Sequence, residues 1–98
     1  MDTTQALSVR DNRAELRYEL GRDGELLGFL LYRLEPEGVV LVHTDIDPAH
    51  EGQGLGSVLV KGALDDLRER GVRAVPLCPF VRAYIRRHPE YADVSASL

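Results

Sequence analysis

The chain has 98 residues, 16 of them acidic and 12 basic, and a net charge of −4, so we expect one domain over residues 1–98 and no general nucleic-acid-binding surface. No apolar run approaches the ~18 residues of a membrane span, and no basic start followed by an apolar stretch marks a secretory signal. The single cysteine excludes an intramolecular disulfide and a cysteine-rich zinc site, and together these features predict a cytoplasmic protein without membrane partners.

The first half of the chain is predicted to form strands. Residues 1–8 are expected to be a loose lead-in. Polar and apolar residues then alternate over residues 14–20, and this period of two predicts a half-buried strand. Its apolar face carries Ala14, Leu16, Tyr18 and Leu20.

Two more strands follow. Residues 21–24 contain an Asp-Gly pair and predict a hairpin turn. Residues 25–34 are nearly continuously apolar, which predicts a central strand covered on both faces. After a turn at residues 35–38, the β-branched run over residues 39–46 predicts a third strand.

The second half of the chain alternates helix and strand. Helical spacing links Leu55, Val58, Leu59, Ala63 and Leu67. Gly71 is suited to end this helix, and Gly62 inside it is expected to permit close packing on the sheet. Residues 72–77 predict a fourth strand, and residues 80–88 predict a second helix. The order β-β-β-α-β-α predicts an α+β fold with a mixed sheet and two helices.

A glycine-rich segment joins the third strand to the first helix. Gly52, Gly54 and Gly56 allow several backbone N–H groups to point at one ligand, and the helix N-terminus adds further donors. This combination favours a phosphate or pyrophosphate site, although glycines that merely turn the chain are the alternative. Neither common phosphate motif is present, since no Lys separates Gly56 from Ser57 and the dinucleotide pattern fails in its third position.

The segment IDPAHEGQGLG, from Ile46 to Gly56, resembles the coenzyme A loop of the GNAT family of N-acetyltransferases. The match holds at Ile46, Pro48, Gly52, Gly54, Leu55 and Gly56. The flanking sequences HTDI and PLCPFVRAYIRRHPEY resemble a minimal branch of that family with about this chain's length. The resemblance implies a GNAT-like, mostly antiparallel sheet.

The resemblance also implies acetyl-CoA as cosubstrate, bound in a wedge between the third and fourth predicted strands, with no metal. Backbone groups near Ile46 would pair with the pantetheine arm, and N–H groups of the loop would hold the pyrophosphate. The implied cofactor residues are Ile46, Gly52, Gln53, Gly54, Leu55, Gly56 and Ser57. Arg82, on one helix face with Arg86, could also contact the CoA phosphates; a solvated charge is the alternative. The chain departs from the family pattern at three positions. Glu51 stands where Arg or Gln is usual, and Phe80 and Arg87 stand where larger members often have Asn and Tyr.

Three residues are candidates for proton transfer or covalent catalysis. His43 and Asp45 share a face of the third strand, where His43 could accept a proton from an amine; the alternative is a half-exposed histidine and a solvated carboxylate. Cys78 follows the fourth strand and could protonate the CoA thiolate, accept the acetyl group itself, or be a buried packing residue. Phe80, Tyr84 and Tyr91 are expected in the core or the groove wall.

The function predicted by the resemblance is acetyl transfer to an amine. Residues 21–24 leave no room for the helices that build the acceptor side in ordinary members, so an open acceptor side is expected. This favours an exposed amine of a protein or peptide, and permits a partner subunit to complete the site. A CoA-binding module without catalysis, and a structural domain without CoA, are the alternatives; the oligomeric state stays open.

Overall fold

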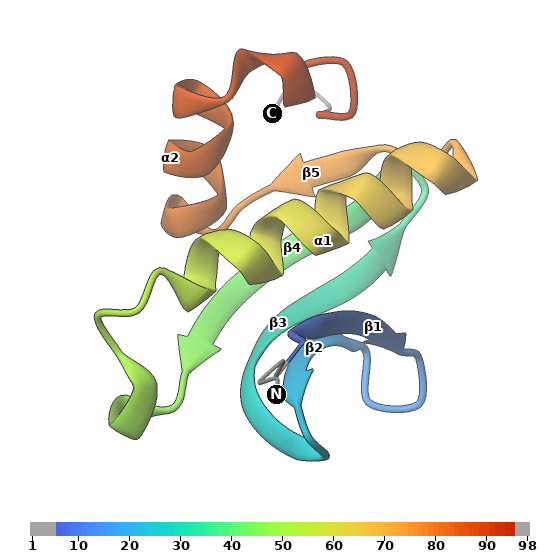
Figure 1. Cartoon of the computed structure of the whole chain (residues 1–98). Helices are drawn as coiled ribbons and strands as arrows, with labels where there is room; N and C mark the ends of the chain where they lie inside the picture. The colour runs from blue at the N-terminus through green and yellow to red at the C-terminus, as the bar shows by residue number, and fades with distance from the viewer. Residues whose placement is uncertain (1–5, 96–98) are drawn as a thin grey trace.

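The computed structural model describes residues 6–95 and contains a five-stranded sheet in the order β1-β2-β3-β4-β5. The bounds are β1 Ser8–Asn12, β2 Arg17–Arg22, β3 Glu25–Glu35, β4 Gly38–Ile46, α1 Leu55–Arg70, β5 Ala74–Pro76 and α2 Pro79–Arg87, with single 3₁₀ turns η1 Pro48–His50 and η2 Pro89–Tyr91. Among the five strands of residues 6–95, only β5 runs parallel to the strand it pairs with. The α+β class predicted from the sequence is therefore confirmed (Figure 1). None of the helices in residues 6–95 has the length and apolar composition needed to cross a membrane.

The sheet contains one strand that was not predicted. β1 begins at Ser8, the last residue of the expected lead-in, and pairs with β2, from Ser8 opposite Gly21 to Asn12 opposite Arg17. Residues 1–5 of that lead-in lie outside the described residues. Because residues 13–16 form the turn between them, the strand expected from Ala14 starts at Arg17 instead. Leu16 is exposed with a φ of 53° and does not join the buried face. The prediction failed because an edge strand with one apolar side chain shows no clear alternation.

The hairpin between β2 and β3 was predicted correctly. Asp23 and Gly24 have φ values of 54° and 79°, the left-handed pair that a two-residue hairpin turn requires. The turn therefore connects the strands directly, with no intervening helix.

Helix α1 packs one face against the sheet and ends where predicted. Its buried residues are Leu55, Leu59, Val60, Ala63, Leu64 and Leu67. Gly71 has a φ of 70° and donates its N–H to the Arg68 carbonyl at 3.1 Å. A Cβ on Gly62 would lie 2.6 Å from the Val9 Cβ, so the close approach expected there is confirmed, with β1 as the neighbour. Val58, expected on the buried face, is exposed.

A bulge in β4 decides which side chains reach each face of the sheet. Leu31 pairs with His43, but the next residue, Tyr32, pairs with Leu41, so Val42 is an extra residue in β4. The extra residue reverses the alternation. Thr44, opposite the buried Leu30, therefore faces α1, as Leu41 does, while His43 faces away from it.

The last two strands separate soon after they pair. β5 pairs with β4 only from Val39 to Leu41. The N–H groups of Leu77 and Cys78 both donate to the Leu41 carbonyl, at 3.1 and 2.8 Å. The strand predicted over residues 72–77 is thus limited to three residues, and beyond it β4 keeps a free edge toward α2.

Both α-helices lie on one side of the sheet. The buried side chains of α2, Val81 and Tyr84, belong to the same core cluster as those of α1. Phe29 and Leu31 of β3 lie outside this cluster and are only half-buried. The prediction that residues 25–34 are covered on both faces is therefore wrong: no helix of residues 6–95 covers the face opposite α1, which we call the open face.

Candidate functional site

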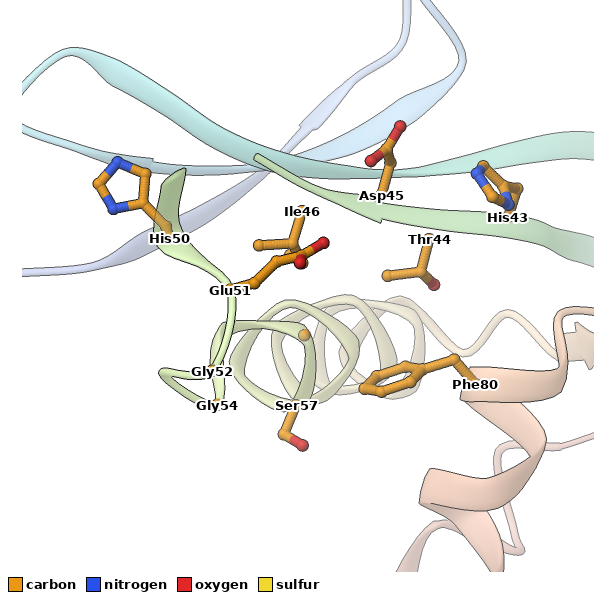
Figure 2. Close-up of a pocket in the computed structure, with 11 residues that line it drawn as sticks. His43, Thr44, Asp45, Ile46, His50, Glu51, Gly52, Gly54, Ser57 and Phe80 are labelled. Atoms are coloured by element: carbon orange, nitrogen blue, oxygen red, sulfur yellow. The ribbon is translucent and has the colours of Figure 1, made fainter. Parts of the chain in front are cut away.

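A cavity of about 440 Å³ lies where β4 ends and α1 and α2 begin (Figure 2). It therefore coincides with the free edge of β4 and with the glycine loop. Its walls are His43, Thr44, Asp45, Ile46, His50, Glu51, Gly52, Gly54, Gly56, Ser57 and Phe80.

The glycine loop supplies a row of hydrogen-bond donors. Gly52 and Gly54 have φ values of 85° and 74°, in the left-handed region that favours glycine. α1 begins at Leu55 without a side-chain cap. Within residues 6–95, the backbone N–H groups of residues 52–57 have no acceptor. These donors and the positive end of the helix dipole form a site suited to a phosphate or another anion.

The free edge of β4 offers main-chain groups to an extended ligand. The Asp47 N–H donates to the Leu27 carbonyl of β3 at 2.8 Å. Main-chain groups alternate along a strand, so those of Ile46 and Thr44 point away from β3, toward the gap beside α2. An amide-containing chain lying in the gap would meet donors and acceptors at the spacing of a neighbouring strand.

Phe80 closes the end of the cavity nearest α2. Its ring lies against α1, where a Cβ on Gly56 would come within 2.8 Å of the Phe80 Cζ. The side chain is still 43% exposed, because the cavity is open beside it. Phe80 therefore forms the groove wall that was expected of it, while Tyr84 and Tyr91 are buried in the core.

The cavity holds no cationic anchor among the described residues that line it, since none is Arg or Lys. Figure 2 shows the Glu51 side chain directed toward β4 rather than away from the cavity. Arg82, predicted to bind the cofactor, is exposed on α2 and is not part of the lining. An anion placed in this cavity would therefore meet mainly backbone N–H groups as donors.

The turn η1 is fixed at the cavity's rim by polar contacts. The Asp47 carboxylate accepts a hydrogen bond from the Ala49 N–H at 3.0 Å. His50 Nε2 lies 3.7 Å from Glu25 Oε2 at the start of β3. Glu25, Asp47 and His50 also place one possible metal-ligand atom each within 4.8 Å of one another. The contacts account for the position of the turn without an ion.

His43 and Asp45 lie on the same face of β4. Figure 2 shows both side chains on the side away from α1, whereas Thr44 points toward it. Among residues 6–95, neither His43 nor Asp45 has a hydrogen-bond or ion-pair partner. The strand therefore separates two exposed ionisable groups on the open face from the Thr44 hydroxyl on the α1 side.

Cys78 is 4% exposed and does not line the cavity. Its Sγ lies 3.4 Å from the Thr44 Oγ1, and its own N–H is bonded to the Leu41 carbonyl. The thiol thus reaches the cavity through Thr44. The role of Thr44 was missed in the sequence because the bulge at Val42, which turns Thr44 toward α1, leaves no mark in the pattern of residues.

The structure brings most of the predicted cofactor residues together. Ile46, Gly52, Gly54, Gly56 and Ser57 line the cavity. Gln53 and Leu55 do not line it. The Gln53 side chain is exposed, and the side chain of Leu55, the first residue of α1, is buried in the core. Both can still take part through their backbone N–H groups, which lie within the row of free donors.

Comparison with known proteins points to one family. Residues 17–94 match the family model described as GCN5-related N-acetyl-transferase. Over 57 residues the chain is 42% identical to a mycothiol acetyltransferase of Thermomonospora curvata, covering 57% of this chain and 19% of that protein. It is 30% identical over 57 residues to the ribosomal protein bS18-alanine N-acetyltransferase of Escherichia coli, covering 58% of this chain and 38% of that protein. The chain thus spans less than half of either relative.

A solved structure agrees with the fold over nearly the whole chain. A GCN5-like protein from Staphylococcus aureus matches with a TM-score of 0.69 at 24% identity, covering 94% of this chain and 90% of that one.

Proposed function

Because this chain belongs to the GCN5-related N-acetyltransferase (GNAT) family, we propose that it is a cytosolic, acetyl-CoA-dependent N-acetyltransferase acting on an exposed amine of a protein or peptide. One observation carries the proposal. A row of free N–H groups over residues 52–57 lies beside the unpaired edge of β4, in one cavity. An unpaired strand edge beside a row of N–H donors suits a long cosubstrate with an amide-containing arm and an anionic end.

Coenzyme A fits these groups by its chemistry. The amides of its pantetheine arm can pair with the main chain of Thr44 and Ile46, as another strand would. The pyrophosphate can accept from the N–H groups of residues 52–57. Arg82, Arg86 and Arg87 of α2 have no ion-pair partner within residues 6–95 and can approach the outer phosphate.

Acetyl transfer would join the amine nitrogen to the thioester carbonyl carbon and break the carbon–sulfur bond. The amine must lose a proton and the departing thiolate must gain one. His43 is our candidate to accept the first, directly or through water, with Asp45 beside it. Cys78 is our candidate to supply the second through Thr44, or to take the acetyl group itself.

The open face supports a large acceptor. The direct β2–β3 hairpin puts no helix over His43 and Asp45, so a peptide can approach them. The Escherichia coli relative is named for an acceptor of this kind, an alanine of a ribosomal protein.

A CoA-binding protein without transferase activity is the second candidate function. Two observations favour it. His43 and Asp45 have no partner that orients them within residues 6–95, and Cys78 is shielded from the cavity. Activity with amine acceptors separates the two functions.

Thermal melting with acetyl-CoA and a CoA-release assay with amines test the proposal together. A ligand at 100 times its Kd stabilises the fold by about 2.7 kcal/mol, so millimolar acetyl-CoA should raise Tm clearly. Thiol release with acetylated product supports the transferase. An unchanged Tm would overturn both candidate functions, and binding without product on any amine would favour the second.

Cys78→Ala tests how the thiolate is protonated. We expect unchanged CoA affinity, a stability loss of about 1–2 kcal/mol, and a fall in acetyl transfer of roughly 10²-fold. Intact-mass spectra after acetyl-CoA alone would show an acetylated species only if Cys78 carries the acetyl group. Wild-type rates in this variant would make Cys78 a packing residue and leave His43 as the main candidate.

A further inference from the structure

The open face combines apolar and ionisable side chains in register. Phe29 lies directly opposite Asp45 in the β3–β4 ladder, and Leu31 lies opposite His43. Residues opposite one another in a ladder have Cβ atoms roughly 4.5–5.5 Å apart, so each pair forms one contact surface. Phe29 and Leu31 are half-buried, yet no helix of residues 6–95 packs on them.

On this surface, the Asp45 carboxylate has no positively charged or hydrogen-bonding partner within residues 6–95. The other carboxylate nearby, Glu19, lies opposite Phe29 on β2 and accepts from Arg17 at 2.8 Å and Asn12 at 2.9 Å. These hydrogen bonds, first from Asn12 and then from Arg17, lower the pKa of Glu19. The Arg17 guanidinium also lies 4.8 Å from the centre of the Phe29 ring. Asp45 has no such partner within residues 6–95, so it is free to attract an incoming ammonium group.

The cavity's shape sets the side from which an amine arrives. A cosubstrate along the edge of β4 would lie beside Thr44 and Ile46 and fill the α1 side of the gap. The reacting carbonyl then stays accessible from the open face, next to His43 and Asp45.

An α-amine uses this surface better than a lysine amine does. In an α-amine, the side chain branches from the carbon that bears the nitrogen, so it lies beside the amine, as Phe29 lies beside Asp45. A lysine amine ends a flexible four-carbon stem, so its nitrogen lies far from any apolar side chain that could pack on Phe29 and Leu31 of the open face.

We propose that the acceptor is the α-amine of a peptide with an apolar first side chain, its ammonium group drawn to Asp45 and its side chain packed on Phe29 and Leu31. The inference rests on the proposed transferase function and names its substrate class. Phe29 and Leu31 are then specificity residues, and Asp45 is the group that raises the local concentration of the acceptor.

Acetylation of a dipeptide-amide panel by the full chain tests the proposal. The panel varies the first residue among Leu, Phe, Gly and Asp, with Nα-acetyl-lysine amide as the side-chain amine. We expect kcat/KM for Leu-first and Phe-first acceptors to exceed that for Asp-first and lysine acceptors by about tenfold or more. Product is read by mass spectrometry, and CoA-induced Tm shifts monitor cosubstrate binding.

Two matched variants place the preference on the open face. Phe29→Ser should bring the Leu-first to Gly-first ratio of kcat/KM close to 1. Leu34→Ser, which changes a 64% exposed leucine on the opposite face of the same strand, should keep the ratio. A preference for the lysine or Asp-first acceptor, or a ratio that Phe29→Ser leaves intact, overturns this inference alone. CoA binding without turnover on any acceptor overturns the proposed transferase function and this inference with it.

Discussion

Comparing Gly54→Val with Gly71→Val separates the stability cost of a strained backbone from the loss of a binding site. Gly54 and Gly71 flank the two ends of α1 with φ values of 74° and 70°. At both positions an added Cβ would meet no atom within 4 Å, so neither substitution causes a clash. Both variants incur the cost of a left-handed L-residue, about 1–2 kcal/mol, which lowers Tm by roughly 4–16 °C in a domain of this size. Gly71→Val is thus a matched control for Gly54→Val.

Only Gly54→Val should weaken CoA binding. Gly54 lines the cavity, and its φ directs the neighbouring N–H groups to one point, whereas Gly71 lies at the far end of the helix. A ligand at 100 times its Kd contributes about 2.7 kcal/mol, and a 100-fold loss of affinity reduces this to about 0.4 kcal/mol. Melting curves with and without CoA should show a large shift for Gly71→Val and almost none for Gly54→Val. Equal shifts in the two variants would refute the placement of the pyrophosphate on this loop.

Three further substitutions test the charges and packing around the site. Glu51→Arg should tighten CoA binding by about 1 kcal/mol at low salt, because it replaces an anion by a cation in a cavity whose described lining has no Arg or Lys. The gain should be smaller at high salt, which screens exposed charges. An affinity that falls, measured by calorimetry, would show that Glu51 holds the loop. Asn12→Ala removes the main hydrogen bond that lowers the pKa of Glu19. A lowered pKa stabilises the fold above the unfolded-state pKa and stops doing so as pH falls through the folded value. Urea unfolding should therefore show a loss of about 1 kcal/mol near neutral pH that shrinks in acid; an equal loss at both would contradict this. Gly62→Ala should destabilise despite a helix-propensity gain of about 1 kcal/mol, because the new Cβ lies 2.6 Å from the Val9 Cβ, and the cost should shrink in a Val9→Gly background, which removes that atom; a stabilising effect with Val9 present would mean that β1 yields easily.

Local chemistry explains which elements could be predicted from the sequence. The Asp23-Gly24 turn and the Gly71 helix end each depend on a residue that tolerates a positive φ, and such residues are visible in the chain. Helix α1 combines a regular apolar period with these end signals. The glycine loop was found for the same reason, since its conformation requires glycine.

The features that were missed depend on partners distant in the sequence. β1 is stabilised as a strand by pairing with β2 and by the contact of Val9 with Gly62, and its own residues show no pattern. The bulge at Val42 follows from how β3 and β4 align, so the faces of Thr44 and Asp45 could not be assigned from alternation alone. Within residues 6–95 the open face has no covering helix because both helices pack on the other side of the sheet, and a strand's own apolar content does not encode where helices pack.

The bulge gives one strand two chemical sides. With strict alternation, Leu41 and Thr44 would face opposite sides of the sheet, and the hydroxyl that contacts Cys78 would lie with the acceptor. The extra residue places Thr44 on the α1 side, beside the donors of the glycine loop, and places His43 and Asp45 on the open face. Acetyl transfer needs one group near the leaving sulfur and another near the incoming amine, both placed around the same carbonyl carbon. Within residues 6–95, a single inserted residue in β4 supplies that division between the two halves of the proposed site.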